Sequence, residues 1–443
     1  MRISSLILII FLFSFSFDVI SQSKDLDLKV LAKQMFDSYE LYKDSTITHR
    51  RFKHKDIVPI IQALPYAYEV AGKSFEGRDI YRVTVGRGNT HILLWSQMHG
   101  DEPTATMALM DMFKFFQAKN DGFDELRESI LSNCTLHIIP MLNPDGAERY
   151  QRRTATEIDM NRDALRLQTV EGRLLKSLQQ SIKPAFAFNL HDQGTRTSAG
   201  RSPKQATISY LATAYDVKSN WNPVRTKAMQ VICSMNNILQ EFIPGHIAKY
   251  SDEHEPRAFG DNIQKWGSSL ILIESGGYPN DKEKQFIRKL NFVSILSGLQ
   301  SISINEYLKY NRADYLSLPT NDVALFDILL RNVTFNENGK KVVKDIGINL
   351  LERNIDNATS FIVESRIDDI GDLSTSWGLN EIDATGAELS FYSTITELPE
   401  NLVISEKQKN IRSIAKGTEA TFVLAKESVL SHMFIDGLLH QAK

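Results

Sequence analysis

The chain has 443 residues, a length that predicts two or three domains. Its formal net charge of −3 gives no electrostatic reason to expect a nucleic acid as a partner. Its two cysteines, Cys134 and Cys233, are too few for a disulfide scaffold; they could pair in an oxidising compartment, but their apolar contexts favour buried free thiols.

The first 22 residues have the properties of a secretory signal peptide. Arg2 supplies a positive charge, residues 6–17 form an apolar run, and Ser21 and Gln22 provide a small-residue cleavage site before the charged KDLDLK. The apolar run is short for a membrane span, although an uncleaved anchor is the alternative. Because no later stretch is long enough to span, we expect a secreted or periplasmic protein without a membrane span after cleavage.

Residues 26–60 are predicted to form amphipathic helix and loop. They contain the basic cluster HRRFKHK at 49–55. We interpret this cluster as a solvated face rather than a site, because lysine and arginine side chains are mostly exposed.

Between about residues 78 and 300, strand-like and helix-like segments alternate. This alternation predicts an α/β domain with a mainly parallel or mixed sheet. The predicted strands are 80–86, 91–97, 135–142, 185–190 and 269–275, and the predicted helices are 103–118, 166–182, 224–242 and 282–307.

The character of the chain changes after about residue 315. Short apolar segments follow one another there, separated by turns rich in Gly and Asn and without long helices between them. We therefore predict a signal peptide at 1–22, a catalytic domain at 23–315 and a β-rich accessory domain at 320–443.

Polar side chains follow the apolar runs that we predict to be buried strands. His99 and Glu102 follow the run at 92–95, His191 ends the segment AFAFNLH, and Glu274 ends SLILIE. In open α/β sheets, ligands bind outside the carboxyl ends of the strands. Each residue alone is a weak signal, but their common position predicts a single site.

The combination of His99, Glu102 and His191 suits a catalytic zinc ion. Such a site takes three nitrogen or oxygen ligands from the protein and keeps a fourth position for water. Zinc lowers the pKa of this water toward about 7, which makes hydroxide available for attack on an amide.

Other residues near the strand ends have side chains suited to the remaining steps. Glu274, outside the ligand set, is the predicted general base. A fixed cation is needed for the developing oxyanion, and Arg153, or its neighbour Arg152, is the candidate.

The segment IDMNRD offers residues for substrate binding and for support of the metal ligands. Arg162, with the neighbouring amide of Asn161, is suited to hold a substrate carboxylate. Asp159 could accept the free ring N–H of a zinc-bound histidine, or simply be a turn residue.

These residues, in this order, resemble the zinc metallocarboxypeptidase family related to carboxypeptidases A and B. HGDE at 99–102 is similar to the family's HxxE ligand pair, and NPDG at 143–146 and D-x-N-R at 159–162 match the block that follows. His191 resembles the third ligand and Glu274 the catalytic glutamate. The resemblance covers about residues 60–310. It implies a three-layer α/β/α sandwich around a mixed eight-stranded sheet, one zinc ion per chain, and a peptide substrate whose free carboxylate is held by Asn161 and Arg162.

The chain departs from the family pattern in two places. The family usually has a tyrosine on a mobile loop before the catalytic glutamate, and Tyr250 is the only tyrosine of the loop at 245–262. Asp101 stands where digestive members carry an arginine, a form commoner in relatives that act on murein peptides and in related deacylases.

The predicted C-terminal domain carries a second resemblance. The segments DILLRNVTF and NEIDATGAEL resemble the small β-sandwich subdomain of amidohydrolases, although the amidohydrolase barrel has no counterpart in the chain. This resemblance implies a smaller β-sandwich that is not catalytic.

Three functions remain open on the sequence. The first is a zinc carboxypeptidase acting on peptides. The second is a murein-peptide amidase or N-acyl amino acid deacylase of the same fold. The third is an inactive homologue that binds a ligand in its crevice, against which the complete set of three ligands and Glu274 argues.

Overall fold

The computed structural model describes residues 18–394, 405, 408, 410–426, 429–435 and 438–441. Most of the predicted signal peptide lies outside the described residues, and helix α1 (Asp18–Asp37) includes its last positions. Within these ranges, no helix is both long enough and apolar enough to cross a membrane.

An eight-stranded mixed sheet forms the centre of the first region. Four neighbouring pairs of strands are parallel and three are antiparallel, so the sheet is mainly parallel, as predicted. In spatial order the strands are β1 (Ala67–Lys73), β2 (Asp79–Gly86), β4 (Cys134–Ile139), β3 (Thr90–Ser96), β5 (Phe186–Asp192), β9 (Ser269–Ser275), β7 (Ile208–Ala212) and β8 (Ile247–Lys249).

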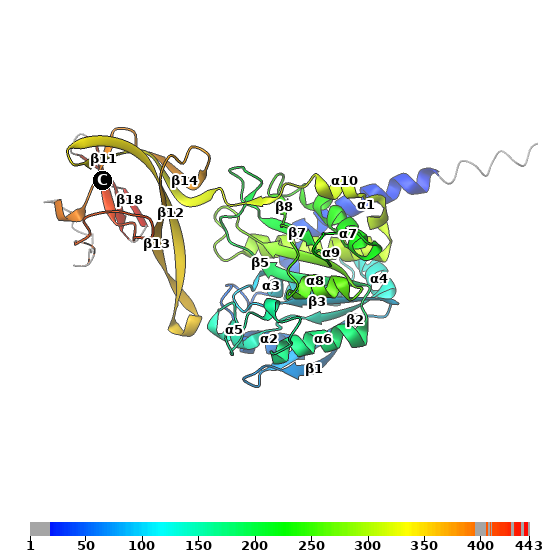
Figure 1. Cartoon of the computed structure of the whole chain (residues 1–443). Coiled ribbons are helices and arrows are strands. Elements are labelled where there is room, and N and C mark those ends of the chain that lie inside the picture. Colours follow the sequence, from blue (N-terminus) through cyan, green and yellow to red (C-terminus); the bar gives the residue numbers. More distant parts are fainter. Residues whose placement is uncertain are drawn as a thin grey trace, which may run out of the picture.

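Helices cover both faces of this sheet, which makes the first region a three-layer structure (Figure 1). Strand β3 shows why its sequence is a continuous apolar run: Ile92 and Leu94 pack in one core, and Leu93 and Trp95 in the other. One face is covered by α1, α3 (Thr104–Gln117), α4 (Asp124–Asn133), α7 (Pro223–Leu239) and α9 (Gln285–Ser303), and the other by α6 (Val170–Ile182) and α8 (Phe259–Lys265). Cys134 and Cys233 are buried free thiols.

A buried ion pair attaches the N-terminal segment to this core. Asp111 of α3 and Arg288 of α9 have no exposed side-chain surface (0% each). Arg288 Nε lies 2.7 Å from Asp111 Oδ2, which also accepts a 2.7 Å hydrogen bond from the hydroxyl of Tyr39. The Arg288 guanidinium also donates to the carbonyls of Asp44 and Ile47. The pair therefore connects two helices with residues 39–47.

The strands after residue 324 form a second mixed sheet, in a region smaller than the first. Its core contains Ile328, Ile348 and Phe422. The strands are β11 (Leu325–Glu337), β12 (Lys340–Ile355), β13 (Ser360–Gly371), β14 (Trp377–Asp383), β15 (Ala387–Ser390), β16 (Phe422–Lys426), β17 (Val429–Ile435) and β18 (Leu438–Gln441).

The connection between the two regions lies against the first one. Strand β10 (Asn321–Asp322) pairs with β6 (Ser198–Ala199), a short strand that follows β5. This pairing does not define where one domain ends and the next begins, so the predicted domain limits, 23–315 and 320–443, stay a prediction.

The hairpin formed by β12 and β13 docks on the basic cluster at 49–55. It reaches from the second sheet toward α5 (Pro144–Arg149) (Figure 1). Arg51 is 3% exposed, and its Nη2 lies 2.8 Å from Glu352 Oε2, while Arg50 also pairs with Glu352. The interpretation of this cluster as a solvated face is wrong, because the charges are matched by a carboxylate far away in the sequence.

Aromatic rings complete this interface. The Arg51 guanidinium lies 4.1 Å from the ring centre of Phe361 and 4.2 Å from that of Tyr150. Asn354 Nδ2 donates to the backbone carbonyls of Arg149 and Tyr150 at 3.2 and 3.1 Å. The hairpin thus contacts the chain two residues before Arg152.

Candidate active site

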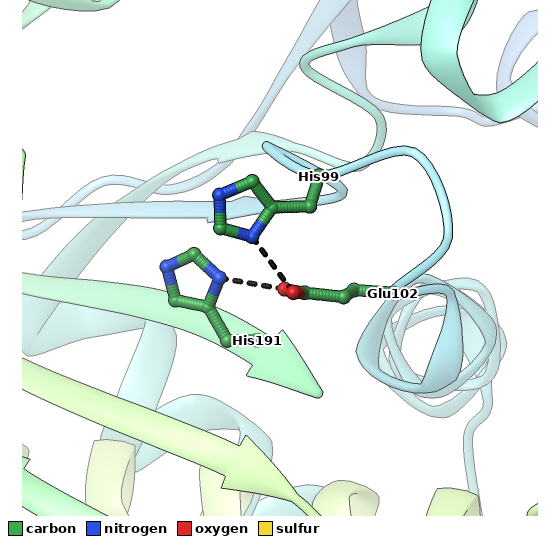
Figure 2. Close-up of side chains that lie close together, drawn as sticks. All are labelled: His99, Glu102 and His191. Atoms are coloured by element: carbon green, nitrogen blue, oxygen red, sulfur yellow. Dashed lines mark hydrogen bonds and ion pairs between the residues drawn. The ribbon is translucent and has the colours of Figure 1, made fainter. Parts of the chain in front are cut away.

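The predicted metal ligands lie together at the carboxyl ends of β3 and β5. His99 follows β3, Glu102 precedes α3, and His191 lies on β5 beside the end of β3. Glu102 Oε1 lies 2.7 Å from His99 Nδ1, and Glu102 Oε2 lies 2.7 Å from His191 Nδ1 (Figure 2). The three residues are buried, and one ligand atom from each lies within 4.8 Å of the others.

The charges of this group favour a bound cation. Burial alone would raise the pKa of Glu102, but His99 and His191 hold it well below its usual value. Burial would lower the pKa of His99, yet the carboxylates of Glu102 and Asp159 raise it to about 9. The acidic groups around His99 therefore favour a positive charge at this position, and two imidazoles with one carboxylate are a donor set that suits zinc.

Asp159 contacts the His99 ring on the side that faces away from Glu102. Its Oδ1 lies 3.2 Å from His99 Nε2, the ring nitrogen that does not face Glu102. The same oxygen accepts a 2.9 Å hydrogen bond from the Asn161 backbone N–H and so caps a short 3-10 turn, η2 (Met160–Arg162). Asp159 is thus both a turn residue and a partner of His99, and such a partner fixes the orientation of the imidazole ring.

Glu274 lies on β9, directly across from His191 in the parallel pairing of β5 and β9. Its side chain lines the same cavity as the three candidate ligands. Burial raises the pKa of Glu274 well above its usual value, and the negative charge of Glu102 raises it further. A raised pKa brings a carboxylate closer to the working range of a general base.

The structure places Arg152 rather than Arg153 in the cavity. Arg152 Nη1 lies 3.2 Å from Glu102 Oε1, and its Nε lies 3.1 Å from Asp159 Oδ2. Arg153 is exposed and its Nη1 donates to the Glu157 carbonyl at 2.8 Å. Of the two arginines considered, Arg152 thus lies beside the candidate ligands and Arg153 does not, while the role of an oxyanion cation stays a prediction.

We expect Arg152→Gln to lower kcat about 10²-fold if Arg152 stabilises developing negative charge, since loss of one such donor costs about this much. Arg153→Gln is the matched control and should retain kcat within about twofold. Steady-state kinetics with zinc content measured on the same samples separates a lost cation from a lost metal. A larger loss in Arg153→Gln would contradict the assignment.

Asn161, Arg162 and Tyr250 line the same cavity, which has a volume of about 370 Å³. Arg162 Nε lies 3.2 Å from Glu255 Oε2, and Asn161 Oδ1 accepts a hydrogen bond from the Phe259 backbone N–H. The pKa of Tyr250 is raised by burial and by the charge of Glu274. All the predicted substrate-binding residues thus face one space.

The cavity also contains residues that sequence reasoning missed. Gln193 and Thr197 come from the loop after β5, and Glu253, Glu255 and Asp261 come from residues 250–261. These residues lie in loops or, for Asp261, in the short helix α8, which are too short for a periodic pattern, so only the position of Tyr250 between two predicted strands pointed to this part of the wall.

Comparisons with known proteins agree with this site. Residues 65–217 match the zinc carboxypeptidase family, peptidase family M14. Carboxypeptidase 2 of Trichophyton tonsurans is 28% identical over 163 residues, covering 36% of this chain and 27% of that protein. Carboxypeptidase SOL1 of Arabidopsis thaliana is 39% identical over 66 residues, covering 15% of this chain and 13% of that protein.

Among solved structures, the metallo-carboxypeptidase from Burkholderia cenocepacia superposes with a TM-score of 0.47 and 14% identity, covering 58% of this chain and 70% of that chain. The matches to the curated relatives named above span less than a third of the length of those proteins.

The match at 65–217 contains His99, Glu102 and His191, and the structure buries all three together. Over these residues the chain is similar to the zinc carboxypeptidase family, and its His-Glu-His group is a donor set that suits zinc. The resemblance of the second region to the small subdomain of amidohydrolases finds no support in these comparisons.

Proposed function

We propose that this protein is a zinc-dependent carboxypeptidase that hydrolyses the C-terminal amide bond of peptides. The observation that carries the proposal is a single cavity that joins the buried His99–Glu102–His191 group to Glu274 and Arg162. His99, Glu102 and His191 would hold one zinc ion per chain. A bound zinc ion supplies Lewis-acid chemistry, because it polarises oxygen ligands and makes water more acidic.

Three side chains of the protein carry out the remaining steps of the reaction. Glu274 accepts a proton from the attacking water and later donates it to the leaving amine. The Arg152 guanidinium faces the negative charge that develops on the carbonyl oxygen. Tyr250, at the cavity wall, closes over the substrate.

Substrate placement depends on Arg162 and Asn161. The Glu255 carboxylate on Arg162 supports this role, since the guanidinium already accommodates a carboxylate within the cavity. A substrate carboxylate would share or replace this contact and so place the terminal amide bond near Glu274.

We expect peptides with a free C-terminal carboxylate to be cleaved at least about 10²-fold faster than the same peptides with an amidated C-terminus. Loss of a charge-assisted pair leaves the Arg162 cation without its partner in the complex. A digest of matched peptide pairs, with mass spectrometry of the products, measures the ratio. Equal rates would favour an amidase or an endopeptidase.

A chelator provides the test of the metal. Peptidase activity should disappear on incubation with 1,10-phenanthroline and return on addition of stoichiometric zinc. Activity that persists after zinc has been removed would contradict a zinc peptidase, whereas a zinc-loaded protein inactive on every peptide would favour the ligand-binding homologue.

A murein-peptide amidase or N-acyl amino acid deacylase is the second candidate. Asp101 favours it, because this half-buried residue lies beside Glu102 in the HGDE segment, where digestive relatives carry an arginine. Hydrolysis of murein peptides or N-acyl amino acids in preference to ordinary peptides would decide for it.

We also propose export to a secreted or periplasmic location, on the basis of the apolar run at 6–17. N-terminal sequencing of the protein recovered from the producing cells tests this location. A mature chain beginning near residue 23 would support it.

A further inference from the structure

We propose that Lys284 and Asp192 form a buried brace that holds in register the two segments that bear the metal ligands and the strand end that bears Glu274. Neither residue has a part in the reaction described above, and both act as positioning residues. The inference rests on the proposed function only in taking His99, Glu102 and His191 as the zinc ligands.

The brace is a small network with one carboxylate oxygen at its centre. Asp192 Oδ2 accepts a hydrogen bond from Lys284 Nζ at 3.0 Å and another from the Thr104 hydroxyl at 2.6 Å. Lys284 Nζ also donates to the Ser275 carbonyl at 3.0 Å. The side chains of Lys284 and Asp192 are each only 7% exposed. These contacts are therefore shielded from solvent and from salt.

The residues that Lys284 connects lie within two positions of a residue of the site in the chain. Asp192 follows His191, Ser275 follows Glu274, and Thr104 lies two residues after Glu102. The β5 and β9 ladder pairs Asp192 with Ser275. A single ammonium group thus connects the ends of two strands, and through Asp192 it reaches the beginning of α3.

Asp192 also has a direct contact with a ligand. Its backbone N–H donates to Glu102 Oε2 at 3.2 Å, the oxygen that faces His191. A movement of the Asp192 side chain would therefore displace a hydrogen bond that orients the Glu102 carboxylate. Partners of this kind affect metal affinity although they do not touch the metal.

Asp192 depends strongly on Lys284. Its second oxygen, Oδ1, is buried and accepts no hydrogen bond from any residue that the structure describes. Without Lys284, the buried negative charge would keep only the Thr104 hydroxyl, and it would lie next to Glu102 and Glu274, which are themselves acidic. Lys284 is the N-cap residue of helix α9, which begins at Gln285.

The experiment measures zinc affinity without substrate. Lys284→Met keeps the length of the side chain and removes its charge, Lys284→Arg keeps the charge, and Lys282→Met is the control at an exposed position two residues earlier. Competition with a chromophoric chelator gives the dissociation constant for zinc, and a thermal melt of each metal-free protein reports folding.

We expect Lys284→Met to weaken zinc binding about 10- to 100-fold, Lys284→Arg to recover part of this loss, and Lys282→Met to match the wild type. If Lys284→Met fails to fold, the zinc affinity of Thr104→Val tests the proposal instead, because this substitution removes one contact of Asp192 and leaves its ion pair with Lys284. A zinc dissociation constant within threefold of wild type in a folded Lys284→Met, or in Thr104→Val in its place, would overturn the brace.

A purely structural role would lower the melting temperature without changing zinc affinity, and that result also overturns the proposal. Failure of the proposed function gives a different result. A wild-type protein that binds zinc and has no peptidase activity contradicts the proposed carboxypeptidase function. The zinc affinity of the variants can still be measured in that case, so the brace is still tested. A wild-type protein that binds no zinc contradicts the metal site and the brace together.

Discussion

Glu274→Gln is expected to lower kcat by about 10³-fold or more while zinc remains bound. Positioned general bases contribute about 10²- to 10⁴-fold, and Glu274 is a cavity carboxylate outside the ligand set that lies across from His191 in the sheet. Glutamine has nearly the same shape but cannot accept the proton of the attacking water. Single-turnover kinetics on a peptide with a free carboxylate, with zinc content determined in parallel, measures the effect.

The pH dependence provides an independent check of this role. Because burial raises the pKa of Glu274, the basic form is lost as the pH falls through that raised value, so kcat/KM of the wild type should fall on the acid side. The residual activity of Glu274→Gln should lack this decrease.

The same shift predicts the stability of the metal-free variant. Ionised Glu274 lowers the folding stability of the metal-free protein at pH values above its raised pKa, so Glu274→Gln should be at least as stable as the wild type at such pH values.

Near-normal turnover in Glu274→Gln would rule out Glu274 as the general base. Glu241→Gln, an exposed substitution outside the cavity, is the control and should keep the turnover of the wild type.

Arg288→Met is expected to lower the free energy of unfolding by about 3–5 kcal/mol, which is the usual cost of removing one partner from a buried ion pair. The substitution leaves Asp111 with a buried charge and also removes the hydrogen bonds to the carbonyls of Asp44 and Ile47. Urea unfolding followed by circular dichroism gives the change. Limited proteolysis should cut first between residues 39 and 47, where the attachment is lost.

The double variant Asp111→Leu/Arg288→Met separates the charge from the packing. Once both charges are removed, no buried ion remains unpaired, so the double variant should be more stable than Arg288→Met alone. Lys227→Met, at an exposed position of α7, should change stability by less than about 0.5 kcal/mol. A cost below about 1 kcal/mol for Arg288→Met would show that the pair does not hold this segment.

The central strands were predictable because burial on both faces leaves a continuous apolar run. His99 follows the run that forms β3, and His191 and Glu274 lie at the ends of the runs that form β5 and β9, so the edge of the sheet that carries the site follows from the sequence. Strand β1 was missed because most of its residues are exposed and its sequence shows no alternation. Strand β8 has only three residues, too few for a periodic pattern.

Other features depend on contacts that no local pattern encodes. Arg152 and Arg153 are adjacent in an irregular segment, and only the fold directs one into the cavity and the other to Glu157. Lys284 precedes a helix and has the local sequence of an ordinary surface lysine. Its burial becomes evident only when β5 and β9 bring Asp192 and Ser275 together.

The docked β12–β13 hairpin limits how this protein can be recombined with its relatives. A chimaera that keeps the first region and replaces the second must supply a carboxylate at the position of Glu352 and a ring at that of Phe361. Otherwise Arg50 and Arg51 lose these partners beside the segment that leads into Arg152. We therefore expect exchange of the two regions as one unit to preserve this interface.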